Sequence, residues 1–211
     1  TDIMDFIVDD CPSPPEIGDT HARPVNITNG NVYVVVHPDP KGEPSLFVFK
    51  TVSESHVGEL SFFRVYSGTI TPGLDMMNEA NGKPERLAQI YVMSGKERKD
   101  VSKLMAGDIG AVVKLKDTHT NDTLSSKTFP VVYVPITFPD PVYHLGIVPK
   151  SKGDEDKIAN GLHSLHQEDP TFVFRVDPEL HQTIISGQGE LHLQVVVKRL
   201  KQKFNVDVDL T

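Results

Sequence analysis

The last third of the chain alternates strand and helix patterns in an order that strongly limits its fold. Runs rich in β-branched and aromatic residues predict strands, and apolar residues spaced by three and four predict helices between them. Strands are expected at 142–150, 171–176, 182–187 and 206–210, and helices between 151 and 169 and at about 189–203. This βαββαβ order predicts a ferredoxin-like α+β domain, a four-stranded sheet with two helices on one face.

The first of these helices has a recognisable start. Ser151 and Asp154 have the spacing of a capping box, and acidic residues favour a helix N-terminus. Ile158, Leu162 and Leu165 then form one apolar stripe, which is typical of a helix packed on a sheet.

Residues from about 31 to 134 consist of short strand patterns separated by turn signals such as Asn29-Gly30, Pro72-Gly73 and Asn81-Gly82. Strands are expected at 32–36, 45–52, 59–67, 87–93, 109–115 and 131–134. Short strands at this spacing, without a helix of about 10 residues between them, predict a closed or nearly closed antiparallel β-barrel.

The N-terminal segment has neither the strand pattern of residues 31–134 nor the alternating strand and helix pattern of the last third. Ile3, Phe6 and Ile7 lie at helical spacing, and the proline-rich run 11–15 is expected to stop that helix. The predicted organisation is therefore 1–28, a short helix and proline-rich linker, then 29–135, the barrel, and 136–211, the ferredoxin-like domain. We expect the chain to be a fragment of a longer protein.

Charge and composition restrict the function. The 211 residues carry 29 acidic and 21 basic side chains, a formal charge of −8, so any contact with RNA must be local. No apolar run approaches the roughly 20 residues that span a bilayer. The lone Cys11 excludes an internal disulfide and fits a reducing compartment, so a cytoplasmic protein without membrane contact is expected.

Motifs of catalysis are missing from the sequence. Gly82-Lys83 and Gly95-Lys96 are followed by Pro84 and Glu97, so neither is a phosphate-binding P-loop. There is no G-x-S-x-G, and Cys11 has no evident base. We expect no catalytic residue, no cofactor and no enzyme activity in this chain.

Two clusters leave a metal site open. His163 and His166 are three residues apart on a helix, which suits a metal edge, but a third ligand is not evident and solvated histidines are favoured. The acids of 154–156 can bind a cation, although a helix N-terminus favours them in any case. An autonomous metal protein or enzyme is thus the disfavoured alternative.

A basic cluster ends the second helix. Its members are Lys198, Arg199, Lys201 and Lys203. Cations suit a helix C-terminus, and a patch that faces RNA is the second interpretation. An autonomous RNA-recognition module is disfavoured, because the strand at 182–187 has no aromatic residue on which a base could stack.

Several segments closely resemble translation elongation factor G. They are FVFKT (47–51), GELSFFRVYSG (58–68), AGDIGAVVKLKDTHTNDTL (106–124), PKSKGDEDKIANGLHSLHQEDPTF (149–172) and SGQGELHL (186–193). The resemblance implies that 1–28 ends a GTPase domain, that 29–135 is the second domain, a barrel shared with elongation factor Tu, and that 136–211 is the third.

The resemblance also implies a function. The fragment would dock on ribosomal RNA and a small-subunit protein, contact the GTPase domain and later domains of its own protein, and couple nucleotide state to domain movement in translocation. GTP and magnesium would bind the full-length, monomeric protein rather than this fragment. Gln188 stands where most members have Met, and the segment VVKLKDT indicates the divergent second-copy branch of the family. Ribosome-protection factors and release factors share the same domain layout and are alternatives.

The candidate coupling site is the turn before the second helix, formed by Gly187, Gln188, Gly189, Glu190 and His192. Both glycines are expected to permit a tight backbone approach or a positive φ, so that Gly189→Val should damage the turn. Glu190 and His192 are expected at the borders of the apolar stripe, dispensable for the core. By resemblance, this edge faces the GTPase domain and the ribosome.

Overall fold

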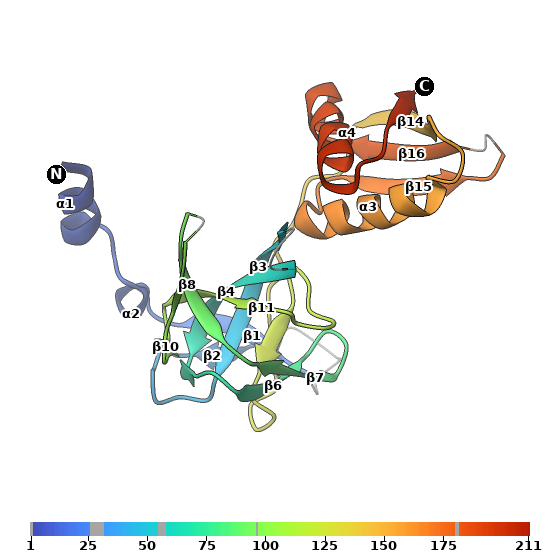
Figure 1. Cartoon of the computed structure of the whole chain (residues 1–211). Coiled ribbons are helices and arrows are strands. Elements are labelled where there is room, and N and C mark those ends of the chain that lie inside the picture. Colours follow the sequence, from blue (N-terminus) through green and yellow to red (C-terminus); the bar gives the residue numbers. More distant parts are fainter. Residues whose placement is uncertain (1, 26–31, 55–57, 96, 180–181) are drawn as a thin grey trace. The chain divides into compact units, whose positions relative to one another are not determined.

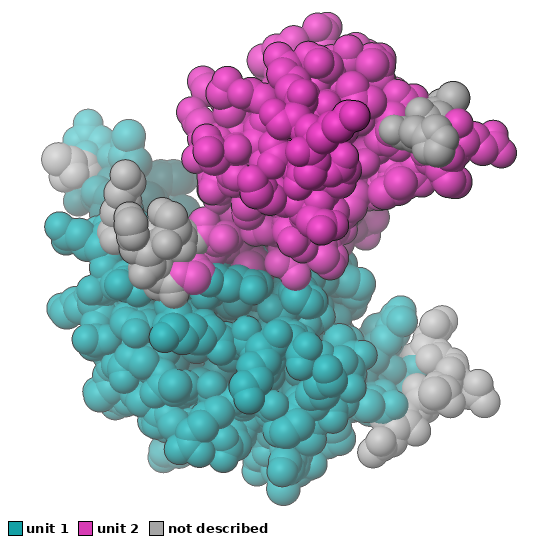
Figure 2. All heavy atoms as spheres, turned by 45° about the vertical axis from the view of Figure 1, so that its right-hand side comes forward, with its two compact units in different colours: residues 1–50, 59–135 teal, residues 51–58, 136–211 magenta. Residues whose placement is uncertain are grey.

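The computed structural model describes residues 2–25, 32–54, 58–95, 97–179 and 182–211. The chain forms two compact units, distinguished by colour in Figure 2. Unit 1 comprises residues 1–50 and 59–135, and unit 2 comprises residues 51–58 and 136–211. No helix in the described ranges is long and apolar enough to cross a membrane.

Unit 1 begins with two helices and continues as strands (Figure 1). The helices are α1 (Asp2–Asp10) and α2 (Pro14–Ile17). The strands are β1 (Thr20–Pro24), β2 (Val34–Val36), β3 (Ser45–Glu54), β4 (Gly58–Ser67), β5 (Thr69–Ile70), β6 (Leu74–Asn78), β7 (Lys83–Leu87), β8 (Ile90–Ser94), β9 (Glu97–Asp100), β10 (Leu104–Met105), β11 (Ile109–Val113), β12 (Thr123–Ser125) and β13 (Val131–Tyr133).

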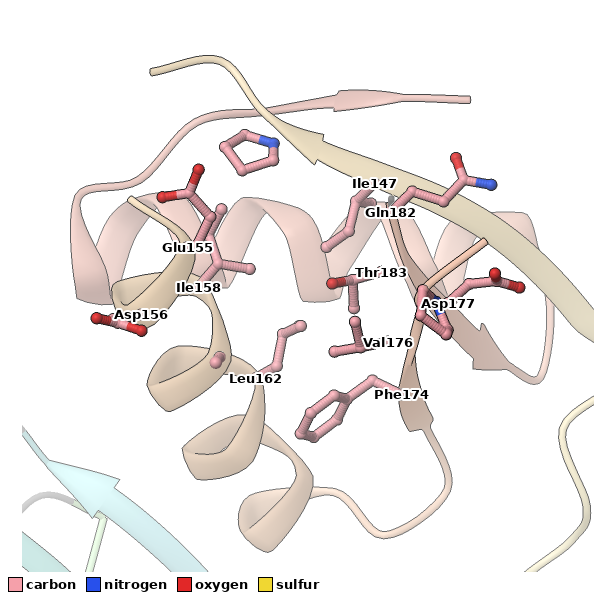
Figure 3. A pocket seen from close by; sticks show the side chains of 13 residues that line it. Ile147, Glu155, Asp156, Ile158, Leu162, Phe174, Val176, Asp177, Gln182 and Thr183 are labelled. Atoms are coloured by element: carbon pink, nitrogen blue, oxygen red, sulfur yellow. The ribbon is translucent and has the colours of Figure 1, made fainter. Parts of the chain in front are cut away.

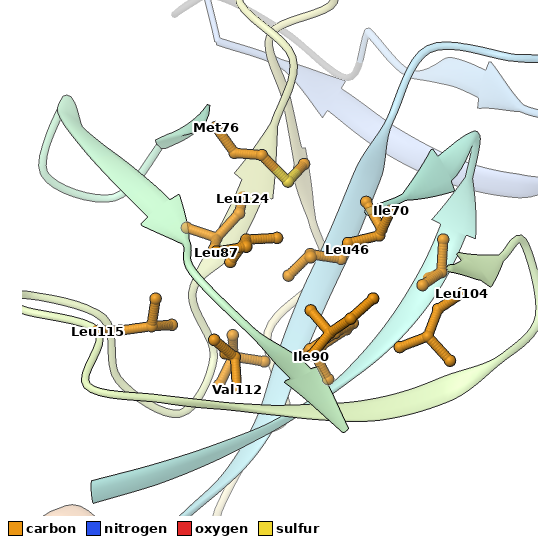
Figure 4. Close-up of a cluster of buried hydrophobic side chains, with 12 residues drawn as sticks. Leu46, Ile70, Met76, Leu87, Ile90, Leu104, Val112, Leu115 and Leu124 are labelled. Atoms are coloured by element: carbon orange, nitrogen blue, oxygen red, sulfur yellow. The ribbon is translucent and has the colours of Figure 1, made fainter. Parts of the chain in front are cut away.

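Antiparallel pairing organises these strands into an eight-stranded sheet of order β7-β6-β12-β3-β4-β11-β8-β9, a β13-β1-β2 sheet and a β10-β5 pair. The main sheet curves around one apolar core, shown in Figure 4. Alternation explains which side chains enter it: in β4, Phe63 and Val65 are fully buried, whereas Phe62 and Arg64 are half-buried. This is the predicted antiparallel barrel.

A buried polar network holds the 116–122 loop onto the barrel. The carboxylate of Glu85, only 4% exposed, accepts hydrogen bonds from the backbone N–H groups of Lys116 and Asp117 and from the Thr118 hydroxyl, at 2.8–3.1 Å. Asn78 Nδ2 donates to Thr118 Oγ1 and to the Asp122 carboxylate. Because each of these buried groups has a partner, the loop is fixed rather than free.

A second apolar cluster lies where β1, β2 and β13 meet the main sheet. Its buried members are Ala22, Val36, Phe47, Val131 and Tyr133. The Tyr133 ring stacks on Tyr66 with centroids 4.3 Å apart, and its hydroxyl is 2.6 Å from Ser45 Oγ. Burial raises the pKa of the Tyr133 phenol, which therefore stays protonated.

Unit 2 is ferredoxin-like. Its elements are β14 (Tyr143–Pro149), α3 (Glu155–Glu168), β15 (Val173–Asp177), β16 (Gln182–Gly187), α4 (Glu190–Phe204) and β17 (Val208–Leu210). The sheet is antiparallel in the order β15-β16-β14-β17, and both helices cover one face of it (Figure 1). The predicted stripes are buried there: Ile158, Leu162, Leu165, Leu193, Val196 and Leu200 share one core.

Local differences from the sequence expectations have physical reasons. The predicted capping box at Ser151 does not form: α3 begins at Glu155, and the Asp154 carboxylate pairs with Lys157 at 2.8 Å instead of capping the helix. The proline run does end α1, but it also starts α2, because proline suits a first helical turn. Seven strands of two to five residues were not expected, namely β1, β5, β6, β7, β9, β10 and β12. β1 lies within 1–28, the segment expected to be a short helix and linker, and β7 and β9 have mainly polar sequences, KPERL and ERKD.

Candidate functional site

The candidate site is the junction between β16 and α4. β16 ends at Gly187, α4 begins at Glu190, and only Gln188 and Gly189 lie between them. The Gln188 side-chain amide donates to the carbonyls of Pro139 and Asp140 at 3.1 Å and lies 3.3 Å from that of Thr171. This exposed glutamine therefore ties the incoming linker to the turn, a role that a methionine could not supply.

Gly187 is the glycine that the junction needs. A Cβ at this position would lie 2.7 Å from His192 Nδ1 and 2.7 Å from Leu193 Cδ2. The expected close approach of strand and helix is thus found at Gly187, where a side chain fits only if the His192 ring and the Leu193 side chain shift.

Gly189 does not have the role expected for it. Its φ of 167° is extended backbone that any residue adopts, and a Cβ there would meet no atom within 4 Å. The prediction that Gly189→Val damages the turn is therefore wrong, because the turn reverses without a left-handed residue at this position.

His192 connects three parts of unit 2. Its Nδ1 accepts the Gln188 backbone N–H at 3.0 Å, so Nε2 carries the ring proton and donates it to the Asp169 carboxylate at 3.1 Å. The ring also meets the Phe172 ring edge-on, and its side chain is only 19% exposed. His192 lies at the border of the apolar stripe, as expected, but it is part of the packing rather than dispensable for it.

Asp169 is the other end of this connection. It follows α3, and its Oδ1 accepts from the Thr171 backbone N–H and hydroxyl at 3.0 and 2.5 Å, which leaves Oδ2 for His192. Burial of the carboxyl acts to raise its pKa, but the hydrogen bonds from Thr171 and the interaction with His192 outweigh burial and place the pKa below its ordinary value. The end of α3 and the start of α4 are thus joined through an ionised carboxylate.

Glu190 is exposed, as expected, and accepts a hydrogen bond from Gln194. Next to it, two apolar side chains that the sequence reasoning missed also face solvent: Leu191 is 73% and Val195 40% exposed. They lie four residues apart and off the buried stripe, which is the signal that could have identified them. We call Leu191, Val195, Lys198 and Arg199, which are spaced by three and four, the outer face of α4.

The basic cluster divides into paired and unpaired members. Lys201 pairs with Asp207 at 2.9 Å, and Lys203 pairs at 2.5 Å with Glu168, whose side chain is only 8% exposed. Lys198 and Arg199 are exposed, and the described part of the chain offers neither an ion pair. Only these two cations therefore remain available to a ligand on this helix end.

In the two clusters considered above as metal sites, several side chains are bound to other groups of the protein. His166 Nδ1 donates to the Phe172 carbonyl at 2.6 Å, while His163 is exposed. In the acidic run, Asp154 pairs with Lys157, and Glu155 accepts the Gly153 N–H at 2.8 Å. Within the described residues, no three His, Cys, Asp or Glu side chains are grouped so that they could hold a metal ion.

Comparison with known families accounts for both units. The model for elongation factor G domain 2 matches residues 43–127, and the model for elongation factor G domain III matches residues 138–211. The chain is elongation factor G-like and covers domains 2 and 3. In this family, these two domains are separate from the GTPase domain. The β16–α4 junction and the outer face of α4 both lie in elongation factor G domain III.

A solved structure is similar to the whole of this chain. A crystal structure of a Thermus thermophilus protein matches with a TM-score of 0.78 and 27% sequence identity. The match covers 100% of this chain and 28% of that one, so the chain spans less than a third of the length of the protein it resembles.

Proposed function

We propose that this chain is the part of a translational GTPase that docks on the ribosome and couples the nucleotide state of a GTPase domain to domain movement in translocation. The match to elongation factor G domains 2 and 3 supports the translational role. The observation that carries the coupling role is the outer face of α4, an apolar and basic surface on a helix that is tied firmly to its sheet.

The composition of this face suggests two neighbours. Leu191 and Val195 lie near the start of α4, and covering a side chain such as Leu191 is worth roughly 1.5–3 kcal/mol, which suits contact with another domain of the same protein. Lys198 and Arg199 lie further along the helix and can each neutralise a phosphate of ribosomal RNA. The net charge of −8 disfavours a general affinity for RNA, so any RNA contact would be local.

The stiffness of the junction supports coupling. Gln188 holds the linker, His192 holds the end of α3, and Gly187 brings α4 against β16. A force on the outer face of α4 would therefore displace the sheet rather than bend the turn. GTP and magnesium would be bound by a GTPase domain of the longer protein, which we expect to work as a monomer in the cytoplasm, while this chain by itself would neither bind nor hydrolyse GTP.

The test compares variants of the full-length protein in ribosome-stimulated GTP hydrolysis and single-round translocation. Leu191→Ala/Val195→Ala and Lys198→Ala/Arg199→Ala should slow translocation about tenfold or more, while unfolding shifts stay within about 0.5 kcal/mol, as for most surface substitutions. Lys198→Ala/Arg199→Ala should also make ribosome binding less dependent on salt. The slope of log affinity against log salt concentration should fall by the amount expected for the loss of about two phosphate contacts.

Lys201→Ala/Gln202→Ala is the matched control, because it removes a neighbouring cation that is already paired. If this control slows translocation as much as the outer-face variants do, the outer face of α4 has no specific role. Activity in ribosome protection or peptide release, without translocation, would assign the protein to one of those related factors.

A further inference from the structure

A small cavity in unit 1 lies between α2, the start of β1 and the second half of β4. Its volume is about 140 Å³. A cavity of about 150 Å³ holds benzene, so this one has room for a ligand of about six non-hydrogen atoms. Its lining includes Pro14, Ile17, Pro38, Arg64 and Tyr66, none of which belongs to the β16–α4 junction or the outer face of α4.

Arg64 is the charged residue among the described residues that line this cavity. Its side chain is half-buried, and its guanidinium carbon lies 5.1 Å from the centre of the Tyr66 ring. Within the described ranges, this guanidinium has neither an ion pair nor a hydrogen-bond acceptor. Because the donors of a guanidinium lie in its plane, stacking on an aromatic face leaves them available to a ligand in the cavity.

A larger cavity in unit 2 lacks such a group. It measures about 370 Å³ and lies between α3 and the sheet (Figure 3). Its described lining contains no lysine or arginine, and Ile147, Ile158 and Leu162 in it belong to the core of the unit. The smaller cavity is therefore the one that offers a ligand a cation without a partner.

Two contacts within unit 1 hold the segments that line the smaller cavity. Pro14 of α2 packs so closely on Gly107 that a Cβ at Gly107 would lie 2.9 Å from the Pro14 Cβ. The Asp19 carboxylate is hydrogen-bonded to His37 Nδ1, and each of these two residues is next in sequence to a residue of the lining. The cavity is thus preformed, so a ligand would not have to order its walls.

The lining favours a ligand with one negative charge and a short apolar part. Ile17 is 64% exposed although it lines the cavity, and the two prolines of the lining are also apolar. A single arginine neutralises a single charge. Asp19 and Asp108 adjoin lining residues in sequence, so a doubly charged anion such as phosphate would meet more repulsion than a singly charged one.

We propose that this cavity binds a small monocarboxylate, with its carboxylate on the Arg64 guanidinium and its short apolar chain against Ile17. Guanidinium and carboxylate have matching planar geometries and form two parallel hydrogen bonds, which gives this class of ligand an advantage over other anions. The inference does not depend on the proposed role in translocation.

Three probes test the proposal: butanoate, its neutral isostere butanamide, and inorganic phosphate. Each is titrated at constant ionic strength into the isotope-labelled chain and followed by NMR. Butanoate should shift the Arg64 Nε–H signal and the Ile17 methyl signals, and should bind about tenfold or more tightly than butanamide, with phosphate weaker than butanoate. Equal binding of butanoate and butanamide, tighter binding of phosphate, or shifts confined to other residues overturns the proposal.

Variants test the role of the guanidinium. Arg64→Gln should weaken butanoate about tenfold, to the level of butanamide, and Arg64→Lys should lie between the two because it keeps the charge but loses the planar fork. Arg23→Gln is the matched control: Arg23 also lies over a tyrosine ring, 5.8 Å from the centre of Tyr33, but does not line the cavity, so its loss should change nothing. Butanoate binding that is insensitive to Arg64→Gln overturns the proposal. The comparison of butanoate with butanamide needs no variant, so it decides the matter if Arg64→Gln does not fold.

Ile17→Trp tests the cavity itself, because the larger side chain would occupy its exposed side. It should abolish the binding of butanoate and butanamide alike, as followed through the Arg64 Nε–H signal, and a folded variant that still binds both contradicts the assignment. The butanoate titration is repeated on the full-length protein, where the same signals should shift. A full-length protein that does not bind butanoate overturns the proposal.

Discussion

His192 joins the start of α4 to the end of α3 through a 3.1 Å hydrogen bond from its Nε2–H to the Asp169 carboxylate. Its other ring nitrogen accepts the Gln188 N–H, so both nitrogens are used within unit 2. A histidine held in this way keeps one orientation. It positions the outer face of α4, and it is not itself free to contact another molecule.

His192→Ala should destabilise the chain by about 1–3 kcal/mol, because it leaves the Asp169 carboxylate and the Gln188 N–H without this partner and removes the contact with Phe172. Glu190→Ala is the matched control, since Glu190 is exposed and lies in the same helical turn, and it should change stability by no more than about 0.5 kcal/mol. Urea unfolding of the two variants measures the difference. Equal effects would contradict the structural role of the histidine.

The Asp169 carboxyl should make stability depend on acid. Its pKa is lowered in the folded state, so its contribution is present above the ordinary value of 3.8 and is lost as the pH falls through the lower folded value. The difference in unfolding free energy between the parent chain and Asp169→Asn should thus be constant near neutral pH and shrink only below 3.8. Unfolding at a series of pH values measures this difference, and a difference that already collapses well above 3.8 would contradict the assignment to the Asp169 carboxyl.

The two glycines of the junction should respond differently to the same substitution. Gly187→Ala places a methyl group 2.7 Å from atoms of His192 and Leu193, and the overpacking should cost about 1–3 kcal/mol. Gly189→Ala adds a methyl group in open space on extended backbone and should be neutral to within about 0.5 kcal/mol. Thermal unfolding of both variants decides the matter. Greater damage at Gly189 would show that the turn has a different geometry.

The two paired lysines of α4, Lys201 and Lys203, should contribute unequally to the stability of the chain. Lys203→Ala leaves Glu168, whose side chain is 8% exposed, with the Ser53 N–H but without its cation. This should cost about 1–3 kcal/mol, because a nearly buried carboxylate loses its charge partner. Lys201→Ala breaks an ion pair that is largely exposed on both sides, and such pairs contribute about 0–1 kcal/mol. Thermal unfolding of the two variants compares their losses of stability, and added salt should reduce only the small loss caused by Lys201→Ala.

The fold could be predicted from the sequence where burial follows a period. The alternation in β4 and the stripes of α3 and α4 identify the buried residues without any tertiary information. β7 and β9 could not be found in this way, because the side chains of β9 all face solvent and one of the two buried side chains of β7 is the charged Glu85, so neither strand carries an apolar alternation. Their positions come from pairing with β6 and β8.

The turn between β16 and α4 could be placed from the sequence, but the contacts made within it depend on tertiary neighbours. Nothing local distinguishes Gly187 from Gly189, since the difference lies in whether α4 approaches the backbone. The link from His192 to Asp169 spans 23 residues and so has no local signature. Lys198 and Arg199 differ from Lys201 and Lys203 only through acids placed by other elements.

The close approach at Gly187 has a consequence for sequence variation. A side chain at position 187 would occupy space now taken by the His192 ring and the Leu193 side chain. Among related proteins, a residue larger than glycine at 187 should therefore occur only together with a smaller residue at 192 or 193. Position 189 should vary without regard to either, so two glycines of one short turn would carry different evolutionary histories.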